Sequence, residues 1–145
     1  MRKQYSIIVL FVLLTFNVDS RGEPAALIGT VNHVRDGDTF EISNIPIRIA
    51  GISAPELNHE LGSEARVFLK KLVLGETIKC ELNGQKSYDR LVGKCYLHNR
   101  DLGKAIVKAG LALDCPKYSK GYYSKYESKK AQKIITFPKY CKMPK

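Results

Sequence analysis

Short runs rich in β-branched residues, each bounded by turn-forming residues, place the strongest limits on how this chain can fold. Five such runs occupy residues 27–34, 39–42, 45–49, 77–82 and 92–97. Asp36-Gly37 separates the first two runs and is a strong turn signal, so the first three runs predict a short antiparallel meander. The last two runs predict a second antiparallel pair, joined by a polar loop at residues 83–90.

Apolar stripes at helical spacing predict two helices, over residues 63–74 and 101–109, and a weaker third helix over residues 122–135. Ser63 and Asp101 stand where N-terminal caps are expected. The predicted order is three strands, a helix, two strands and two helices. This order indicates the α+β class, as a five-stranded OB-fold β-barrel with about three flanking helices.

The N-terminus has the pattern of a secretory signal peptide. A short basic stretch, MRK, precedes an apolar run from Tyr5 to Phe16, which is shorter than the roughly 20 residues that a membrane-spanning helix needs. Ser20 stands where a signal peptidase reads a small residue, which predicts cleavage after it. An uncleaved anchor and a buried core strand are the alternatives. We predict a signal peptide over residues 1–20 and one exported domain, periplasmic or secreted, over residues 21–145.

The cysteines indicate disulfides rather than a metal site. There are four of them, Cys80, Cys95, Cys115 and Cys141, with no C-x-x-C pair, and the three histidines are scattered. An even number of cysteines in an exported chain is typical of two disulfides formed in an oxidising compartment. Of the three possible pairings, the strand prediction favours Cys80–Cys95 and Cys115–Cys141, because an antiparallel pair would bring the first two close together.

Positive charge is concentrated in the C-terminal segment. The chain carries a net charge of +10, yet residues 21–115 are almost neutral, whereas residues 116–145 contain nine lysines, one acidic residue and five of the eight tyrosines. Lysines interleaved with aromatic rings suit a single-stranded nucleic acid, because lysines contact phosphates and rings stack on bases. A solvated, lysine-rich surface that binds nothing is the alternative.

Charged side chains also gather where the predicted strands end, in the stretches RDGDT, IRIAGISAPE and SYDR. Hydrolysis of a phosphodiester needs a base that activates water and cations that neutralise the phosphoryl oxygens. Asp38 and Glu56 supply carboxylates, and Arg48 and Arg90 supply two guanidinium forks from different strands. An exported protein also meets Ca²⁺, which prefers several oxygen ligands.

The stretches VRDGDTFEI, IRIAGISAPE, YDR and LGKAIVKAGLA, in this order, resemble the staphylococcal nuclease (thermonuclease) family over roughly residues 27 to 118. The resemblance implies an OB-fold barrel and calcium-dependent hydrolysis of DNA and RNA on the 5′ side of the phosphodiester, which leaves 3′-phosphates. A monomer that acts on nucleic acid, preferably single-stranded, is expected.

The resemblance also implies roles for individual residues. Arg48 and Arg90 correspond to the two arginines that clamp the phosphate, and Glu56 to the proposed general base. Tyr88 stands where the family places a tyrosine near the terminal phosphate. Tyr118 falls near the position at which the family has a tyrosine that stacks on a base.

One departure from the family pattern concerns the metal site. By resemblance, Asp38 ligates calcium directly, Asp36 acts through water and the backbone carbonyl of Ala54 completes the site. Ser53 stands where the family usually has a further aspartate ligand, so we expect weaker calcium binding because affinity depends on ligand charge. The alternative function is a non-catalytic OB-fold nucleic-acid-binding protein with a degenerate metal site. The intact arginines and Glu56 favour the enzyme, because a pure binder needs no base.

Overall fold

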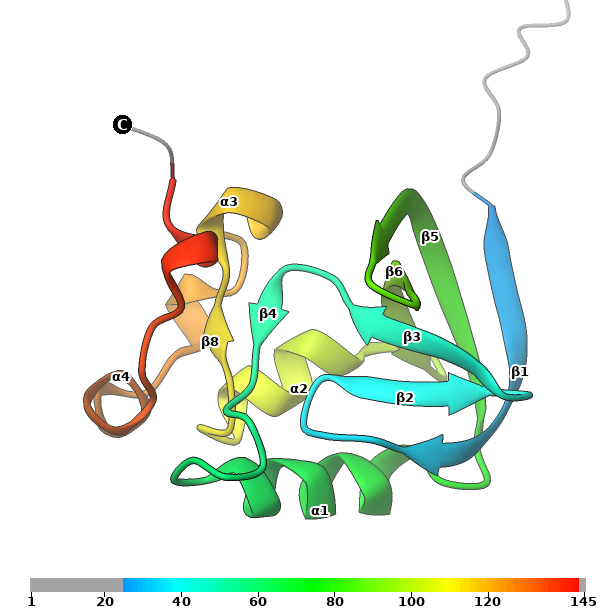
Figure 1. Ribbon diagram of the computed structural model, residues 1–145, viewed down its shortest axis with the longest axis horizontal. Coiled ribbons are helices and arrows are strands. Elements are labelled where there is room, and N and C mark those ends of the chain that lie inside the picture. The colour runs from blue at the N-terminus through cyan, green and yellow to red at the C-terminus, as the bar shows by residue number, and fades with distance from the viewer. Residues whose placement is uncertain (1–24, 144–145) are drawn as a thin grey trace, which may run out of the picture.

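The computed structural model describes residues 25–143, so the predicted signal peptide lies outside the described residues. Within them, no helix has both the length and the apolar character needed to cross a membrane. The described residues form an α+β fold with a mostly antiparallel sheet (Figure 1), which confirms the predicted fold class.

The main sheet contains the five predicted strands, with irregular pairing in β1 between Val31 and His33 and in β5 between Leu82 and Lys86. The strands are β1 (Ala26–Val34), β2 (Thr39–Ile42), β3 (Ile45–Ile49), β5 (Thr77–Ser87) and β6 (Arg90–Leu97). They pair in the order β3-β2-β1-β5-β6, and a short strand β7 (Arg100–Asp101) extends the β6 edge. Strand β3 also pairs with β6 in parallel, so the five strands form a closed ring of backbone pairings.

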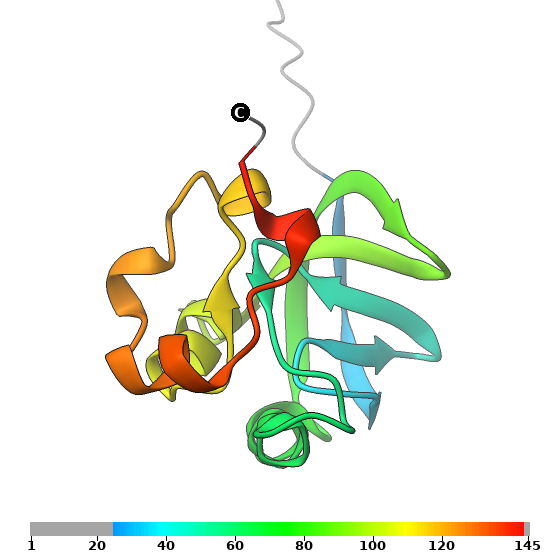
Figure 2. The same ribbon diagram turned by 60° about the vertical axis from the view of Figure 1, so that its left-hand side comes forward.

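Helices and a small second sheet surround this ring. The further elements are β4 (Ile52–Ser53), α1 (Gly62–Val73), α2 (Leu102–Lys108), β8 (Leu113–Asp114), α3 (Pro116–Ser119), η1 (Ser124–Tyr126), α4 (Lys129–Ile134) and η2 (Lys139–Cys141). Strands β4 and β8 pair with each other, and the C-terminal helices lie on their far side from the main sheet (Figures 1 and 2). The two-stranded sheet therefore joins the ring to the C-terminal segment.

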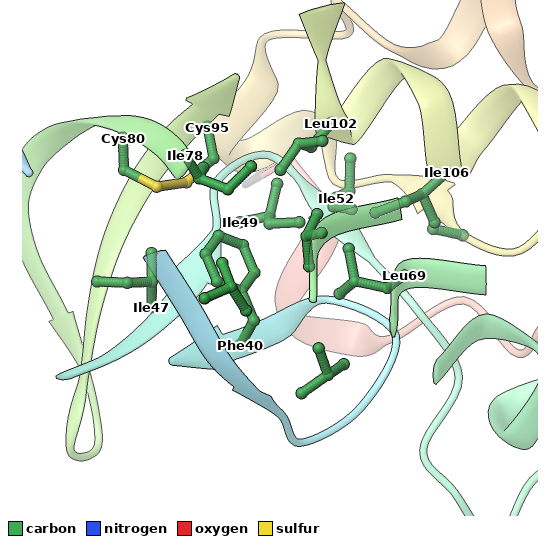
Figure 3. Close-up of a cluster of buried hydrophobic side chains, with 14 of the residues drawn as sticks. Phe40, Ile47, Ile49, Ile52, Leu69, Ile78, Cys80, Cys95, Leu102 and Ile106 are labelled. Carbon is green, nitrogen blue, oxygen red and sulfur yellow. A yellow bond between two sulfur atoms is a disulfide. The ribbon is translucent and has the colours of Figure 1, made fainter. Parts of the chain in front are cut away.

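The core fills the ring and the space beneath α1 and α2, as Figure 3 shows. Its largest fully buried side chains include Phe40, Ile47, Ile49, Ile52, Leu69, Ile78, Leu102 and Ile106. Both predicted disulfides are confirmed. Cys80–Cys95 joins directly opposed residues of β5 and β6, and Cys115–Cys141 ties the C-terminal segment to the residue after β8. One disulfide thus cross-links two strands of the ring, and the other cross-links the C-terminal segment to the end of β8.

Two predicted elements were wrong. Residues 83–90 are not a loop, because β5 and β6 continue as a paired ribbon to Ser87 and Arg90 with a turn between them. The helix predicted over residues 122–135 is instead the short η1 and the separate helix α4. Ser128 causes the break: its backbone is extended and its hydroxyl accepts the Ala131 N–H, which starts a new helix there.

The predicted helix starts were right in one case and wrong in the other. Asp101 caps α2, because its carboxylate accepts the backbone N–H of Lys104. Helix α1 does not start with a capping serine. It begins at Gly62, directly after Leu61, whose backbone is left-handed with a φ of 66° and whose side chain makes no cap. The tight turn before α1 therefore sets its first residue, and Ser63 lies inside the helix.

The turn between β1 and β2 packs against its neighbours so closely that only glycine fits at Gly37. A Cβ atom on this residue would lie 2.5 Å from Cβ of Ala65 in α1 and 2.7 Å from Cβ of Ala54. Gly37→Ala is expected to lower the free energy of unfolding by about 1–3 kcal/mol, because overpacking a rigid contact forces backbone shifts. Urea denaturation measures this. Gly84→Ser is the comparison: its Cβ meets open space, so it reports the cost of a side chain on a left-handed backbone (φ 76°) without a clash.

Candidate active site

A groove of about 700 Å³ opens at the side of the ring where β3, the β5–β6 ribbon and the C-terminal segment meet. Its walls include five of the predicted site residues and one tyrosine that was not predicted: Arg48, Glu56, Tyr88, Arg90, Tyr118 and Tyr140. Residues far apart in sequence thus share one concave surface. Such a groove, with a few convergent charged groups, is the usual form of a binding site.

The two arginines are linked by a chain of hydrogen bonds through buried polar groups. Arg48 on β3 lies opposite Thr39 on β2 and forms an ion pair with Asp38. The hydroxyl of Thr39 donates to the same Asp38 oxygen at 2.9 Å, and Nη1 of Arg90 donates to this hydroxyl at 3.0 Å. Arg90 also bonds Ser87 through its Nε and Nη2 atoms. Each guanidinium is therefore held in a defined orientation at the groove wall.

Three carboxylates lie at this end of the ring. Asp38 is 4% exposed, and its Oδ2 accepts the backbone N–H of Ala54 at 3.2 Å. Asp36 accepts the backbone N–H of Asp38 at 3.0 Å. Burial, followed by the negative charge of Asp38 and a smaller contribution from Glu56, raises the pKa of Asp36 to about 6. Glu56 itself is exposed and faces the groove.

A hard cation at these groups would meet oxygen ligands but little negative charge. The predicted metal residues Asp36, Asp38 and Ala54 lie together. Across residues 25–143, however, no three His, Cys, Asp or Glu side chains form a group that could hold a metal. Ser53, 3% exposed, points its hydroxyl at Tyr140 instead. Oxygen donors are the type that Ca²⁺ prefers, but two adjacent carboxylates are the main charges that this set supplies.

The predicted substrate tyrosines stand at the rim of the groove. Tyr88 occupies the tip of the β5–β6 ribbon, where its side chain is 94% exposed and the Arg90 guanidinium lies 5.9 Å from the centre of its ring. Tyr118 is 48% exposed and also lines a smaller neighbouring hollow. Both rings are therefore accessible at the rim of the groove.

The tyrosines of the C-terminal segment do not share one role. Tyr123 is buried, its hydroxyl donates to Asp101, and burial together with the charge of Asp101 raises its pKa. Its ring packs in the core and cannot stack on a base. Tyr122 packs edge-on against Tyr123, whereas the lysines of the segment within the described residues are exposed. The C-terminal segment therefore presents a basic surface, but fewer of its tyrosine rings are accessible than the composition suggests.

Two residues of the site were not predicted from the sequence, Thr39 and Tyr140. Thr39 is completely buried and joins Asp38 to Arg90. Its position directly after Asp38 in RDGDT was a usable signal. Tyr140 approaches from the C-terminal segment, and its only signal in the sequence is the neighbouring Cys141.

Comparisons with known proteins bear on the family to which this chain belongs. A family model described as staphylococcal nuclease homologue matches residues 46–134. The probable endonuclease LCL3 of Pyricularia oryzae is 29% identical, over 60% of this chain and 48% of that protein. An uncharacterised endonuclease of Haemophilus influenzae is 27% identical, over 78% of this chain and 66% of that protein. Staphylococcal-like nuclease CAN1 of Arabidopsis thaliana is 33% identical, over 61% of this chain and 28% of that protein. The chain spans less than two thirds of the length of these relatives.

Proposed function

Because this chain belongs to the family of staphylococcal nuclease homologues, we propose that it is an exported calcium-dependent nuclease that hydrolyses phosphodiester bonds of DNA and RNA. The observation that carries the proposal is that Arg48, Arg90 and Glu56 line one groove. Cations attract a phosphate backbone, whereas a carboxylate among them repels it. A protein that only binds nucleic acid has no use for that carboxylate, but a hydrolase needs it as a base.

The proposed mechanism assigns one task to each side chain. Glu56 accepts a proton from the water molecule that attacks phosphorus, and the buried Pro55 before it restricts the backbone that carries it. Arg48 and Arg90 donate hydrogen bonds to the phosphoryl oxygens, on which negative charge grows in the transition state. The family resemblance places the broken bond on the 5′ side, so the product retains a 3′-phosphate.

The proposed ligands for Ca²⁺ are the carboxylate of Asp38, which would bind directly, the carbonyl of Ala54, and Asp36, which would act through water. When bound, the cation would supply positive charge that polarises the scissile phosphate. Glu56 remains free for the proton because it is exposed and forms no ion pair within the described residues. Tyr88 and Tyr118 are proposed to contact the sugar and base on either side of that phosphate.

A calcium-titrated nuclease assay tests the proposal. The purified protein is incubated with fluorescent single-stranded DNA and RNA oligonucleotides over a range of free Ca²⁺, and then with a chelator. We expect fragments ending in 3′-phosphate that form with calcium and stop forming with chelator. If the calcium-loaded protein binds the oligonucleotides but leaves them intact, the chain is a non-catalytic OB-fold binding protein.

Ser53 offers a direct test of the metal site. Ser53→Asp adds a carboxylate beside Asp38, so the Ca²⁺ concentration for half-maximal cleavage is expected to fall by about tenfold, because calcium affinity rises with ligand charge. Calorimetric titration of calcium without substrate provides a second measurement. Ser63→Asp adds the same charge at an exposed position of α1 and is expected to leave the calcium requirement unchanged. An equal shift in both variants would place the cation elsewhere.

A further inference from the structure

We propose that Tyr140 is a positioning residue for the cleavage reaction, an inference that rests on the proposed nuclease function. Its hydroxyl bridges Arg48 and Ser53 in the groove, and the Cys115–Cys141 disulfide holds it there. The family match ends at residue 134. Tyr140 and Cys141 therefore belong to a part of this chain that the family pattern does not describe.

The contacts of Arg48 explain why a further anchor is useful. One end of its guanidinium is held by Asp38. Nη2, at the other end, donates to the carbonyl of Ile52 at 3.2 Å and to the hydroxyl of Tyr140 at 3.3 Å. A planar guanidinium binds phosphate through two parallel N–H groups only when its plane is fixed. Tyr140 lines the groove and is 50% exposed, so it lies on the open side of the groove. From there it helps to fix the plane of the guanidinium.

Ser53 makes the bridge necessary. A carboxylate at this position could accept a hydrogen bond from an arginine directly. The shorter serine side chain makes no hydrogen bond to Arg48 among the described residues, but its Oγ lies 3.1 Å from the Tyr140 hydroxyl. That hydroxyl accepts from Arg48 and still has its own proton to donate to Ser53. The tyrosine thus connects two groups that the serine alone leaves apart.

The disulfide supplies the rigidity that this role requires. Tyr140 lies in η2, directly before Cys141, whose partner Cys115 follows β8. The backbone N–H of Cys115 donates to the carbonyl of Gly51 at 2.9 Å, so the cross-link is anchored beside the groove. In Figure 2, the C-terminal segment runs back from α4 toward this point. The cross-link thus adds a covalent tie to the hydrogen bonds by which Tyr140 holds η2 at the groove.

Tyr140→Phe tests the role in the full protein, because it removes one hydroxyl and keeps the ring. With single-stranded oligonucleotide and saturating Ca²⁺, we expect kcat to fall about tenfold, the scale of one hydrogen bond to a charged group, and KM to change less than about threefold. This split is expected when an interaction acts mainly in the transition state. Tyr96→Phe, on β6 outside the groove, is the matched control and should retain wild-type kcat.

Combining Tyr140→Phe with loss of the disulfide shows whether the two changes affect kcat through the same contact, which a merely structural role would not predict. Cys115→Ala/Cys141→Ala is expected to lower kcat by a similar factor, and to lower it little further when combined with Tyr140→Phe, because both changes act through one hydroxyl. Fully additive losses would overturn the link between the disulfide and the tyrosine. If the cysteine variant does not fold, Tyr140→Phe alone decides.

The two proposals fail in different ways. Wild-type kcat in Tyr140→Phe, in a protein that cleaves nucleic acid, overturns the positioning role and leaves the nuclease function intact. A wild-type protein that binds oligonucleotide but never cleaves it overturns the nuclease function itself.

Discussion

Replacing Glu56 by glutamine is expected to lower kcat for phosphodiester cleavage by about 10²- to 10⁴-fold, the usual contribution of a general base. Glutamine keeps the size and the polarity of the side chain but cannot accept the proton of the attacking water. Affinity for a single-stranded oligonucleotide, measured by fluorescence anisotropy with chelator present, should stay the same or rise slightly, because a negative charge leaves the groove.

Glu60→Gln is the matched control. Glu60 is an exposed glutamate in the same loop, and it does not line the groove, so its loss should leave cleavage unchanged. A Glu56→Gln protein with wild-type turnover would remove Glu56 from the role of base. The base would then have to be sought among Asp36 and Asp38, the other carboxylates at this end of the ring.

Replacing Arg48 by methionine should have two large effects. Cleavage is expected to fall by about 10²- to 10³-fold, as when one donor to a developing oxyanion is removed. The free energy of unfolding is expected to fall by about 3–5 kcal/mol, because the change leaves a buried carboxylate without its partner. The side chains of Arg48 and Asp38 are only 14% and 5% exposed. Cleavage assays and urea denaturation measure the two effects.

Arg35→Met is the control that shows whether the loss of stability in Arg48→Met comes from burial of the ion pair or from the loss of any arginine. Arg35 also forms ion pairs, with Glu41 and Asp89, but its side chain is 36% exposed. Exposed pairs contribute little, so the expected loss of stability is below about 1 kcal/mol. If both variants lose the same stability, the Arg48–Asp38 pair does not owe its effect to burial. A further variant, Arg48→Met/Asp38→Asn, should recover part of the stability but none of the cleavage.

The strands of the ring could be predicted from the sequence because they are short runs rich in β-branched residues between turn residues, and in β3 the side chains also alternate between buried and exposed. In β3, for example, Ile47 and Ile49 are buried while Arg48 between them faces the groove. The ribbon at residues 83–90 could not be predicted in this way. Most of its residues are polar and exposed, so it carries no alternation, and only pairing between the two strands shows that it is not a loop.

The helix predicted over residues 122–135 failed for a tertiary reason. Tyr123 is drawn into the core by hydrogen bonds, from its N–H to Asp114 and from its hydroxyl to Asp101. These contacts outweigh the weak helical preference of a lysine-rich segment, whose stability in isolation is small at this length. A new helix then starts at the Ser128 cap.

By itself, the sequence determined the strand order through local patterning, and the order of its short motifs indicated the groups of the proposed reaction. The strand prediction also favoured the cysteine pairing that the structure shows. Only the tertiary structure decided how those groups are held. The link from Arg90 through Thr39 and Asp38 to Arg48 crosses three strands, and Tyr140 reaches Arg48 from 92 residues away along the chain. Such contacts leave no periodic signal in the sequence, because they arise from the closure of the ring and from the disulfide that returns the C-terminal segment to it.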